Sequence, residues 1–325
     1  MSDHQLPVRE NPPIIVLNPD GSCTRFIPNP CTPPTTDQDL DPLVLTKDLT
    51  INYINQTGVR IHIPKETLTS TRCPVEKLPL VVYYHGGGFI FSTAATTITH
   101  ELCNRLAAHV PAIVVNVDYR LAPEHRLPAA YDDGVEALHW LKSTEDPWLA
   151  NYANLSNCYL MGTSAGANLA YHAGLRVSKQ LQDLEPLKIK GLILHSLFIG
   201  GVERVESEVR LADTGQQLTL SISDTMWDFC LPIGASREHE YCNPMAGCGL
   251  DDMGWVKDSG WQVMMVDRYG DLLIDRQMGF AKTLKLKGVE CRCFYGDGDH
   301  GIEYYDESKA KELFEEVSSF ISSIN

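Results

Sequence analysis

The chain has 325 residues, of which 42 are acidic and 27 are basic, so its formal net charge at pH 7 is −15. This charge argues against nucleic acid and anionic lipid surfaces as partners, because both are themselves negative. The first twenty residues lack the basic start and apolar core of a secretory signal, and no later apolar run is long enough to span a bilayer. We therefore expect a cytoplasmic protein with no membrane partner, in one large α/β domain or two smaller ones.

Residues 1–45 are rich in proline and predict an extended arm that contributes to a cap, with one short strand near "PIIVLN" (13–18). Residues 46–325 are expected to form a single domain, because apolar strand-like runs alternate with helical patterns from residue 58 onward. This alternation predicts a mostly parallel central sheet with helices on both faces. The expected strands are 59–64, 78–84, 111–119, 157–162, 188–195, 261–267 and 290–296. The expected helices are 97–110, 129–142, 164–177, 275–288 and 306–324.

The alternation stops between about residues 200 and 260. There "TLSISDTMWDFCLPIG" (219–234) predicts a helix, and "EHEYCNPMAGCG" (238–249) predicts a loop. An insertion at this place is expected to form a small helical cap with substrate-contacting residues, because loops over a rigid sheet build its binding face. The alternative is a surface excursion without such contacts.

Ten cysteines are scattered along the chain without a secretory signal. This distribution favours reduced thiols, since disulfides are typical of small secreted domains. The closest spacings, Cys291 with Cys293 and Cys242 with Cys248, lack the further His or Cys ligands that a zinc site requires. We therefore expect no metal and no cofactor.

Three glycines, Gly86, Gly87 and Gly88, follow the expected strand at 78–84 in the stretch "YYHGGGFIF". Glycine adopts backbone angles closed to other residues and leaves its N–H group unshielded. Such a cluster is either a tight turn or a binding loop for an oxyanion, and this stretch alone does not separate the two.

A second motif decides between the tight turn and the oxyanion-binding loop. The stretch "GTSAG" (162–166) stands between an expected strand and an expected helix, which is the G-x-S-x-G pattern of a sharp turn that only small flanking residues allow. Ser164 would then stand exposed at the edge of the sheet. The N–H groups of Ala165 and of the glycine loop could converge on one oxygen, so the two motifs together predict a serine nucleophile with an oxyanion hole.

A serine nucleophile requires a histidine base and an acid, and both are expected later in the chain. His300 stands after the last expected strand and before the last helix, where a histidine loop reaches the serine. Asp271 lies on the loop after the strand at 261–267 and is the favoured acid, while Asp267 at the end of that strand is its rival. Four further residues are candidates for substrate contacts: Gly88, Thr163, His195 and Trp227.

Two of these four candidates have a structural alternative. His195 ends a strand at the same edge of the sheet, and a buried, hydrogen-bonded role is favoured for it over lining the pocket. Trp227 belongs to the expected cap and is either a wall of the pocket or packed core.

These motifs, together with "VDYRLAPEHRLPAAYDD" (117–133), "YGDLLIDRQ" (269–277) and "DHGIEYYD" (299–306), resemble the plant carboxylesterases of the hormone-sensitive-lipase-like branch of the α/β-hydrolase family. The resemblance extends from about residue 45 to nearly the end of the chain. It implies structural ion pairs for Arg120 and the acids of 117–133. It also implies the α/β-hydrolase fold and these roles: Ser164 as nucleophile, Asp271 as acid, His300 as base, and Gly86, Gly87 and Ala165 as oxyanion donors.

The chain departs from the family pattern beside the serine. Thr163 stands where the family usually has an acidic residue, and Ala167 where it has a second glycine. The expected function is hydrolysis of a small-molecule carboxylic ester through an acyl-enzyme in plant specialised metabolism, with an alkaloid methyl ester and subsequent decarboxylation as one candidate. The alternatives are a cyclase or lyase on the same scaffold, and a binding module like the gibberellin receptors. Those receptors have lost the histidine, so His300 favours an enzyme.

Overall fold

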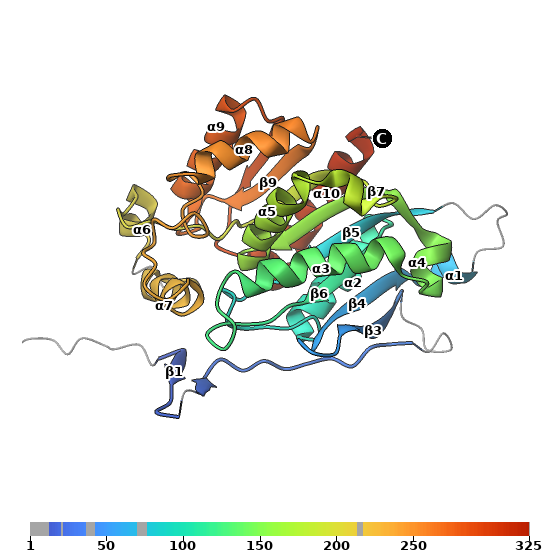
Figure 1. Cartoon of the computed structure of the whole chain (residues 1–325), viewed down its shortest axis with the longest axis horizontal. Helices are drawn as coiled ribbons and strands as arrows, with labels where there is room; N and C mark the ends of the chain where they lie inside the picture. Colours follow the sequence, from blue (N-terminus) through green and yellow to red (C-terminus); the bar gives the residue numbers. More distant parts are fainter. Residues whose placement is uncertain (1–12, 21, 37–42, 70–76, 213–216, 325) are drawn as a thin grey trace, which may run out of the picture.

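A computed structural model describes residues 13–20, 22–36, 43–69, 77–212 and 217–324. Its centre is one eight-stranded sheet in the order β10-β9-β8-β7-β5-β6-β4-β3 (Figure 1). The six strands from β5 to β10 run parallel, whereas β4 pairs antiparallel with both β6 and β3. The strands are β3 (Val44–Asn52), β4 (Thr57–Pro64), β5 (Leu78–Tyr84), β6 (Ile113–Asp118), β7 (Ala153–Thr163), β8 (Ile189–His195), β9 (Gln262–Arg268) and β10 (Cys291–Gly296).

Helices cover both faces of this sheet (Figure 1). One face carries α2 (Thr97–His109) and α10 (Glu307–Ile324). The other carries α3 (Ala129–Ser143), α5 (Ala165–Ser178), α8 (Gly249–Asp258) and α9 (Ile274–Leu286). Successive side chains of a strand point to opposite faces, so β5 serves both cores: Val82 and Tyr84 pack under α3 and α5, and Val81 and Tyr83 under α2 and α10. The α/β-hydrolase fold expected from the sequence is confirmed.

The shorter elements lie around this frame. They are the hairpin strands β1 (Ile15–Leu17) and β2 (Cys23–Arg25), the helices α1 (Lys65–Thr69), α4 (Pro147–Tyr152), α6 (Glu206–Arg210) and α7 (Leu220–Cys230), and the 3₁₀ turns Leu181–Leu184 and Ile302–Tyr304.

Two elements differ from the sequence-based expectation. The strand β3 begins inside the stretch that was expected to be arm, and its polar residues hide a strand that is buried on one side only. The helix α8, inside the expected cap, packs against α5 and leads directly into β9. It is therefore the layer helix between β8 and β9, and the cap is reduced to α6, α7 and their loops.

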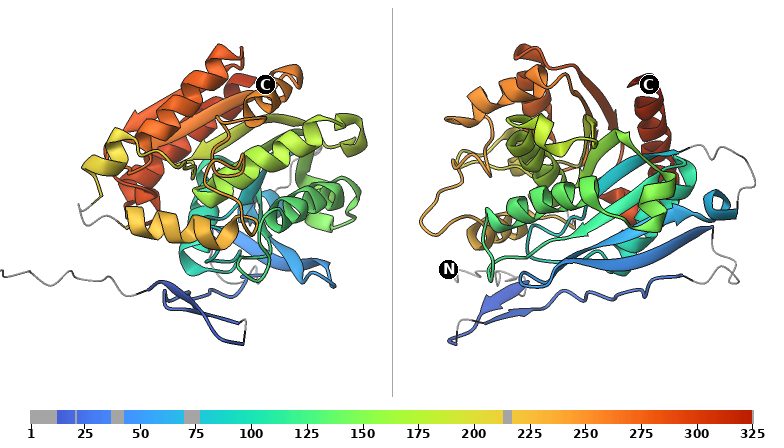
Figure 2. Two further views of the ribbon diagram at one scale, coloured as in Figure 1. Left: turned by 60° about the vertical axis from the view of Figure 1, so that its left-hand side comes forward. Right: turned by 45° about the vertical axis from the view of Figure 1, so that its right-hand side comes forward.

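The described part of the N-terminal arm is attached beside α7, and Figures 1 and 2 show the hairpin and α7 on the same side of the molecule. Arg25 donates from Nε to the carbonyl of Ile90 at 2.7 Å and from Nη2 to that of Ala122 at 2.9 Å. Further along, the N–H of Thr32 donates to the carbonyl of Ala95 at 2.9 Å. The segment 26–31 is therefore held at both of its ends.

Candidate active site

The loops that follow four parallel strands meet at one edge of the sheet. The glycine loop follows β5, Ser164 follows β7, Asp271 follows β9 and His300 follows β10. In open α/β sheets, ligands bind at this edge because the loops there are free to vary while the strands fix their origins. Residues distant in the sequence are thereby brought together.

The turn around Ser164 is a strained strand-to-helix elbow. Ser164 has φ 58° and ψ −120°, in a region that non-glycine residues rarely adopt. A Cβ at Gly162 would lie 2.1 Å from the backbone of Gly166, and one at Gly166 would lie 1.8 Å from the carbonyl oxygen of Tyr84. Both flanking glycines are therefore required by close backbone contacts, as the motif predicts.

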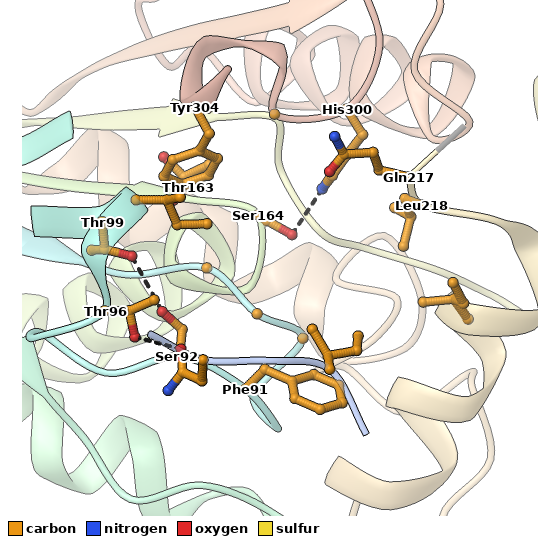
Figure 3. Close-up of a pocket in the computed structure, with 18 of the residues that line it drawn as sticks. Phe91, Ser92, Thr96, Thr99, Thr163, Ser164, Gln217, Leu218, His300 and Tyr304 are labelled. Carbon is orange, nitrogen blue, oxygen red and sulfur yellow. Dashed lines mark hydrogen bonds between the residues drawn. The ribbon is translucent and has the colours of Figure 1, made fainter. Parts of the chain in front are cut away.

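The three expected triad residues form one hydrogen-bonded chain. His300 Nε2 lies 2.8 Å from Ser164 Oγ (Figure 3). On the other side of the ring, His300 Nδ1 lies 2.7 Å from Asp271 Oδ2. Asp271 is fully buried and also accepts from Gln277 Nε2 and from the N–H of Leu273, each at 2.9 Å. These two donors fix the orientation of the carboxylate toward the imidazole.

The surroundings of His300 suit a base that takes up a proton. Burial lowers the pKa of His300, but the charge and hydrogen bond of Asp271 outweigh this effect, with help from Glu303 and Asp299. The pKa of His300 is therefore raised above its usual value. The imidazolium that forms when Ser164 loses its proton is stabilised.

Asp267, the rival acid, is placed differently. It is fully buried, and its carboxyl oxygens make no hydrogen bond to a side chain among the described residues. Burial raises the pKa of Asp267 well above its usual range, and the neighbouring charge of Asp271 adds to this. A neutral carboxyl group without contact to His300 does not orient or stabilise the imidazolium, so the geometry favours Asp271.

The glycine loop is shaped by positive backbone angles, with φ 109° at Gly87 and 62° at Gly88. The carbonyl of Gly87 accepts from the N–H groups of Ile90 and Phe91 at 3.0 and 2.9 Å, which turns the loop back on itself. Ala165 is the first residue of α5, where an N–H group has no acceptor within the helix. The N–H groups of Gly86, Gly87 and Ala165 are the expected oxyanion donors, and these loops bring them beside Ser164.

The tract at 117–133 supports this loop from behind. Tyr119 stacks on His85 with ring centroids 4.2 Å apart, and its hydroxyl donates to the carbonyl of His85 at 2.7 Å. Arg120 Nη2 donates to Asp133 Oδ1 at 2.7 Å, and Asp133 is 1% exposed. The expected structural ion pair in this tract is therefore present.

Ser164 and His300 open into a cavity of about 420 Å³. Among the described residues that line it, His300 is the only Asp, Glu, Lys, Arg or His. The wall beside Ser92 is rich in hydroxyl groups, and the wall beside Leu218 is apolar (Figure 3). Most of the lining comes from residues 27–30, 86–88, 91–99, 217–226 and 300–305.

Two of the four residues expected to contact substrate line this cavity. Gly88 does so while also contacting α7, since a Cβ there would lie 2.1 Å from Met226 Sδ. Thr163 also lines it. His195 and Trp227 do not: both are buried behind the wall, His195 within 2.9 Å of Thr163 Oγ1 and Trp227 stacked on Phe198. The structural alternative therefore holds for both.

Several residues of the cavity lining do not follow from any sequence motif. Ile27, Pro28, Asn29 and Pro30 come from the arm, which was expected only to contribute to a cap. The sequence feature that points to residues 27–30 is the proline-rich composition of the arm. It predicts an extended segment but not the position of that segment relative to the sheet. Tyr304 belongs to the motif "DHGIEYYD" (299–306) that contains His300, but no role in the cavity was predicted for it.

A hydrogen-bonded Ser, His and Asp at the wall of a cavity is an arrangement suited to ester hydrolysis, and the comparisons with known proteins point to the same class of protein. Residues 81–303 match the model of a protein family whose description is "alpha/beta hydrolase fold". The chain belongs to this family. Its fold also resembles an esterase from the archaeon Pyrobaculum calidifontis, with a TM-score of 0.72 and 26% identity over 87% of this chain and 86% of that one.

Plant carboxylesterases are much closer in sequence. The chain is 48% identical to carboxylesterase 20 of Arabidopsis thaliana over 95% of both proteins. It is 42% identical to 3-O-acetylpapaveroxine carboxylesterase CXE1 of Papaver somniferum, over 94% of this chain and 95% of that one. The likeness to plant carboxylesterases expected from the motifs is confirmed, and the chain is a carboxylic ester hydrolase.

Three further observations concern partners and cofactors. No helix among the described residues is long and apolar enough to cross a membrane. In the same part of the chain, no group of three or more His, Cys, Asp or Glu side chains could hold a metal ion. Each cysteine that the structure describes is a free thiol.

Proposed function

We propose that the protein hydrolyses an uncharged carboxylic ester through an acyl-enzyme on Ser164, with His300 as general base and Asp271 as its orienting acid. The observation that carries this proposal is the continuous hydrogen-bonded chain from Ser164 through His300 to Asp271 at the wall of the cavity. A receptor-like binding module does not require this chain, whereas acyl transfer does.

In the first half of the reaction, Ser164 Oγ attacks the ester carbonyl carbon while its proton moves to His300 Nε2. The carbonyl oxygen becomes an oxyanion and accepts hydrogen bonds from the N–H groups of Gly86, Gly87 and Ala165. The intermediate collapses, the bond from carbon to the alkoxy oxygen breaks, and His300 passes its proton to the leaving alcohol. In the second half, water takes the place of the alcohol and releases the carboxylic acid.

The cavity favours an uncharged substrate with a bulky apolar part. The lining within the described part of the chain includes no Asp, Glu, Lys or Arg, so a permanently charged group would lose hydration there without gaining a partner. Its volume of about 420 Å³ lies within the usual range for sites that enclose a whole small molecule. We propose an ester of plant specialised metabolism, and the relative named for an alkaloid ester makes that class the first to test.

The experiment combines labelling with a substrate panel. A fluorophosphonate should modify Ser164, identified by mass spectrometry of the labelled peptide, and Ser164→Ala should abolish both labelling and turnover. Values of kcat/KM for neutral alkaloid, terpenoid and phenylpropanoid esters are then compared with those for short p-nitrophenyl esters. Absence of labelling would contradict the serine mechanism, and a clear preference for the short esters would contradict the bulky substrate.

Product analysis of the same incubations tests two finer expectations. Release of an alcohol and an acid identifies hydrolysis, whereas a product of unchanged mass identifies cyclisation. Loss of carbon dioxide from a freed acid, expected for an alkaloid methyl ester, would appear as a product 44 mass units lighter than the acid, a difference fixed by the mass of carbon dioxide. The cytoplasmic location stays a prediction, for which imaging of a tagged protein is the measurement.

A further inference from the structure

A second chain of polar side chains lies buried behind the nucleophile. Thr163 Oγ1 is 2.9 Å from His195 Nδ1, and His195 Nε2 is 2.8 Å from Glu303 Oε2. The other carboxylate oxygen of Glu303 accepts from Arg268 Nε at 2.7 Å. All four residues are 0% exposed. We refer to Thr163, His195, Glu303 and Arg268 as the buried array.

The buried array is attached to every segment of the triad. Thr163 directly precedes Ser164, and the carbonyl of His195 accepts from the N–H of Ser164 at 2.9 Å. Glu303 lies three residues after His300, in the 3₁₀ turn that ends the histidine loop. Arg268 ends β9, three residues before the triad acid. One connected set of contacts therefore joins the nucleophile, base and acid loops.

The contacts of the buried array centre on the Glu303 carboxylate. Burial would raise the pKa of Glu303, but His195 and Arg268 outweigh it and lower the pKa to about 2, so this carboxylate only accepts. His195 Nε2 lies 2.8 Å from this acceptor, and Nδ1 of the same ring lies 2.9 Å from the hydroxyl oxygen of Thr163. That hydroxyl is also 2.7 Å from the hydroxyl of Tyr83, which can donate to it.

Stability alone is a poor reason for such an array. Burying an arginine, a carboxylate and an imidazole costs desolvation, and well-packed apolar residues often serve a core equally well. Two needs of the site explain it better. The positive φ of Ser164 must be imposed by surrounding contacts, and a displacement of about 1 Å between nucleophile and base is costly in rate.

We propose that Thr163, His195, Glu303 and Arg268 are positioning residues for ester hydrolysis. They hold Ser164 and His300 in register, and the Glu303 carboxylate favours uptake of the serine proton by His300. The proposal rests on the proposed function, because it assumes that Ser164 and His300 react with the ester.

Glu303 supplies the electrostatic part of this role, which is to raise the pKa of His300. It is one of several charged or polar groups that face His300. The loop after β9 contributes Asp271, the histidine loop contributes Asp299 and Glu303, and the elbow between β7 and α5 contributes the hydroxyl of Ser164. Asp267 is held neutral, and the guanidinium of Arg268 is directed to Glu303 and Glu312. Removal of the Glu303 charge should therefore lower the pKa of His300 while leaving its contact with Asp271 intact.

The first test compares Thr163→Val with Thr163→Ser. Valine keeps the shape but removes the hydroxyl that joins His195 to the elbow, whereas serine keeps that hydroxyl. With active sites titrated by a fluorophosphonate and p-nitrophenyl acetate as substrate, Thr163→Val is expected to lower kcat about tenfold with KM within twofold. Thr163→Ser should recover most of that loss. Equal kcat per titrated site in Thr163→Val and the wild type would overturn the positioning role.

The second test compares Glu303→Gln with Glu312→Gln. Glu312 contacts the same arginine at 2.8 Å, but its side chain is 34% exposed and it lies outside the array. Loss of the Glu303 charge should move the acid limb of the kcat/KM profile to lower pH by about half a unit, because a base with a lower pKa is neutral at lower pH. Glu312→Gln should leave the limb unchanged. A limb that is unmoved in folded Glu303→Gln would overturn the electrostatic role.

The outcomes separate this proposal from the proposed function. If the wild type is not labelled by the fluorophosphonate, the serine mechanism itself fails. If the wild type is labelled and the Thr163 variants have equal kcat, only the array proposal fails. Should Glu303→Gln not fold, as judged by circular dichroism, the Thr163 pair decides the positioning role by itself, because its two variants differ by a single hydroxyl group.

Discussion

The floor and the roof of the cavity are built in different ways. The floor consists of short loops that follow parallel strands, and its key contacts are hydrogen bonds of 2.7 to 2.9 Å between buried groups. The roof consists of residues 27–30 from the arm and 217–226 around α7, whose contributions are mainly apolar side chains. On the proposed function, this difference implies that the sheet fixes the reacting groups, while the contacts that select the substrate come from segments that can change without disturbing them.

The largest effect on activity is expected from removal of the nucleophile, which belongs to the floor of the cavity. Ser164→Ala is expected to lower kcat by at least about 10⁴-fold, because no other group can form the acyl-enzyme. The fold should be retained, since the side chain points into the cavity. Burst kinetics and thermal unfolding of the purified variant measure both effects. Residual turnover within tenfold of the wild type would show that the floor does not carry the chemistry.

The acid of the floor gives the next largest effect. Asp271→Asn is expected to lower kcat on the order of 10⁴-fold, because the amide cannot stabilise the imidazolium. Asp267→Asn, four residues earlier near the end of β9, is the matched control, and it should cost less than tenfold because burial already raises the pKa of Asp267 well above its usual range. Steady-state kinetics of both variants, checked for equal folding, decide the assignment. The reverse order would transfer the role to Asp267.

The pH dependence sharpens the account of the floor. The pKa of His300 is raised because the charge of Asp271 outweighs burial, and only the neutral imidazole can accept the serine proton. Below that pKa, kcat/KM should therefore fall about tenfold per pH unit, with a midpoint above the usual imidazole value of about 6.5. A profile of kcat/KM from pH 5 to 9 measures it, and a midpoint below 6 would contradict the electrostatics described for the site.

In the roof, Met226→Ala should change selectivity more than chemistry. Met226 lines the cavity and contacts Gly88, so its truncation enlarges the space for a bulky ester. We expect kcat/KM for bulky relative to short esters to rise about tenfold, the scale of one or two methylene groups in an apolar pocket. Met278→Ala, at an exposed site on α9, is the control. An unchanged ratio would show that Met226 on α7 does not influence the selection between bulky and short esters.

The smallest effect is expected where the arm is attached. Arg25→Met removes the donors to Ile90, Ala122 and Glu124 and should loosen residues 27–30. KM should rise a few-fold at nearly constant kcat, because the affected contacts bind substrate and its transition state equally. Arg210→Met, at an exposed helical ion pair, is the control. A fall in kcat with unchanged KM would show that Arg25 affects the chemical step and not substrate binding.

Much of the floor was predictable from the sequence. The glycine loop and the elbow are local motifs, and the strands before them are short apolar runs, so their positions follow from residues a few places apart. The position of His300 after the last strand followed from the order of elements. Asp271 was separated from Asp267 by loop position, and the contact with His300 supports that choice.

The rest depends on contacts between distant residues. The link between His195 and Glu303 joins positions 108 residues apart, and no periodicity in either segment indicates it. The strand β3 was missed because alternate polar residues on an edge strand resemble a loop. The helix α8 was assigned to the cap because little in "GLDDMGWVKD" shows that Met253 and Val256 are buried. Burial is set by packing, which local patterns only partly encode.

The lack of a lysine or arginine among the described residues of the cavity lining also concerns the end of the catalytic cycle. The acid released by hydrolysis ionises at neutral pH, and in that lining no permanently cationic side chain is present to retain the anion once His300 has lost its proton. The net charge of −15 further disfavours its return from solution. Product inhibition by the acid should therefore be weak, and the neutral alcohol should be the stronger inhibitor of the two products.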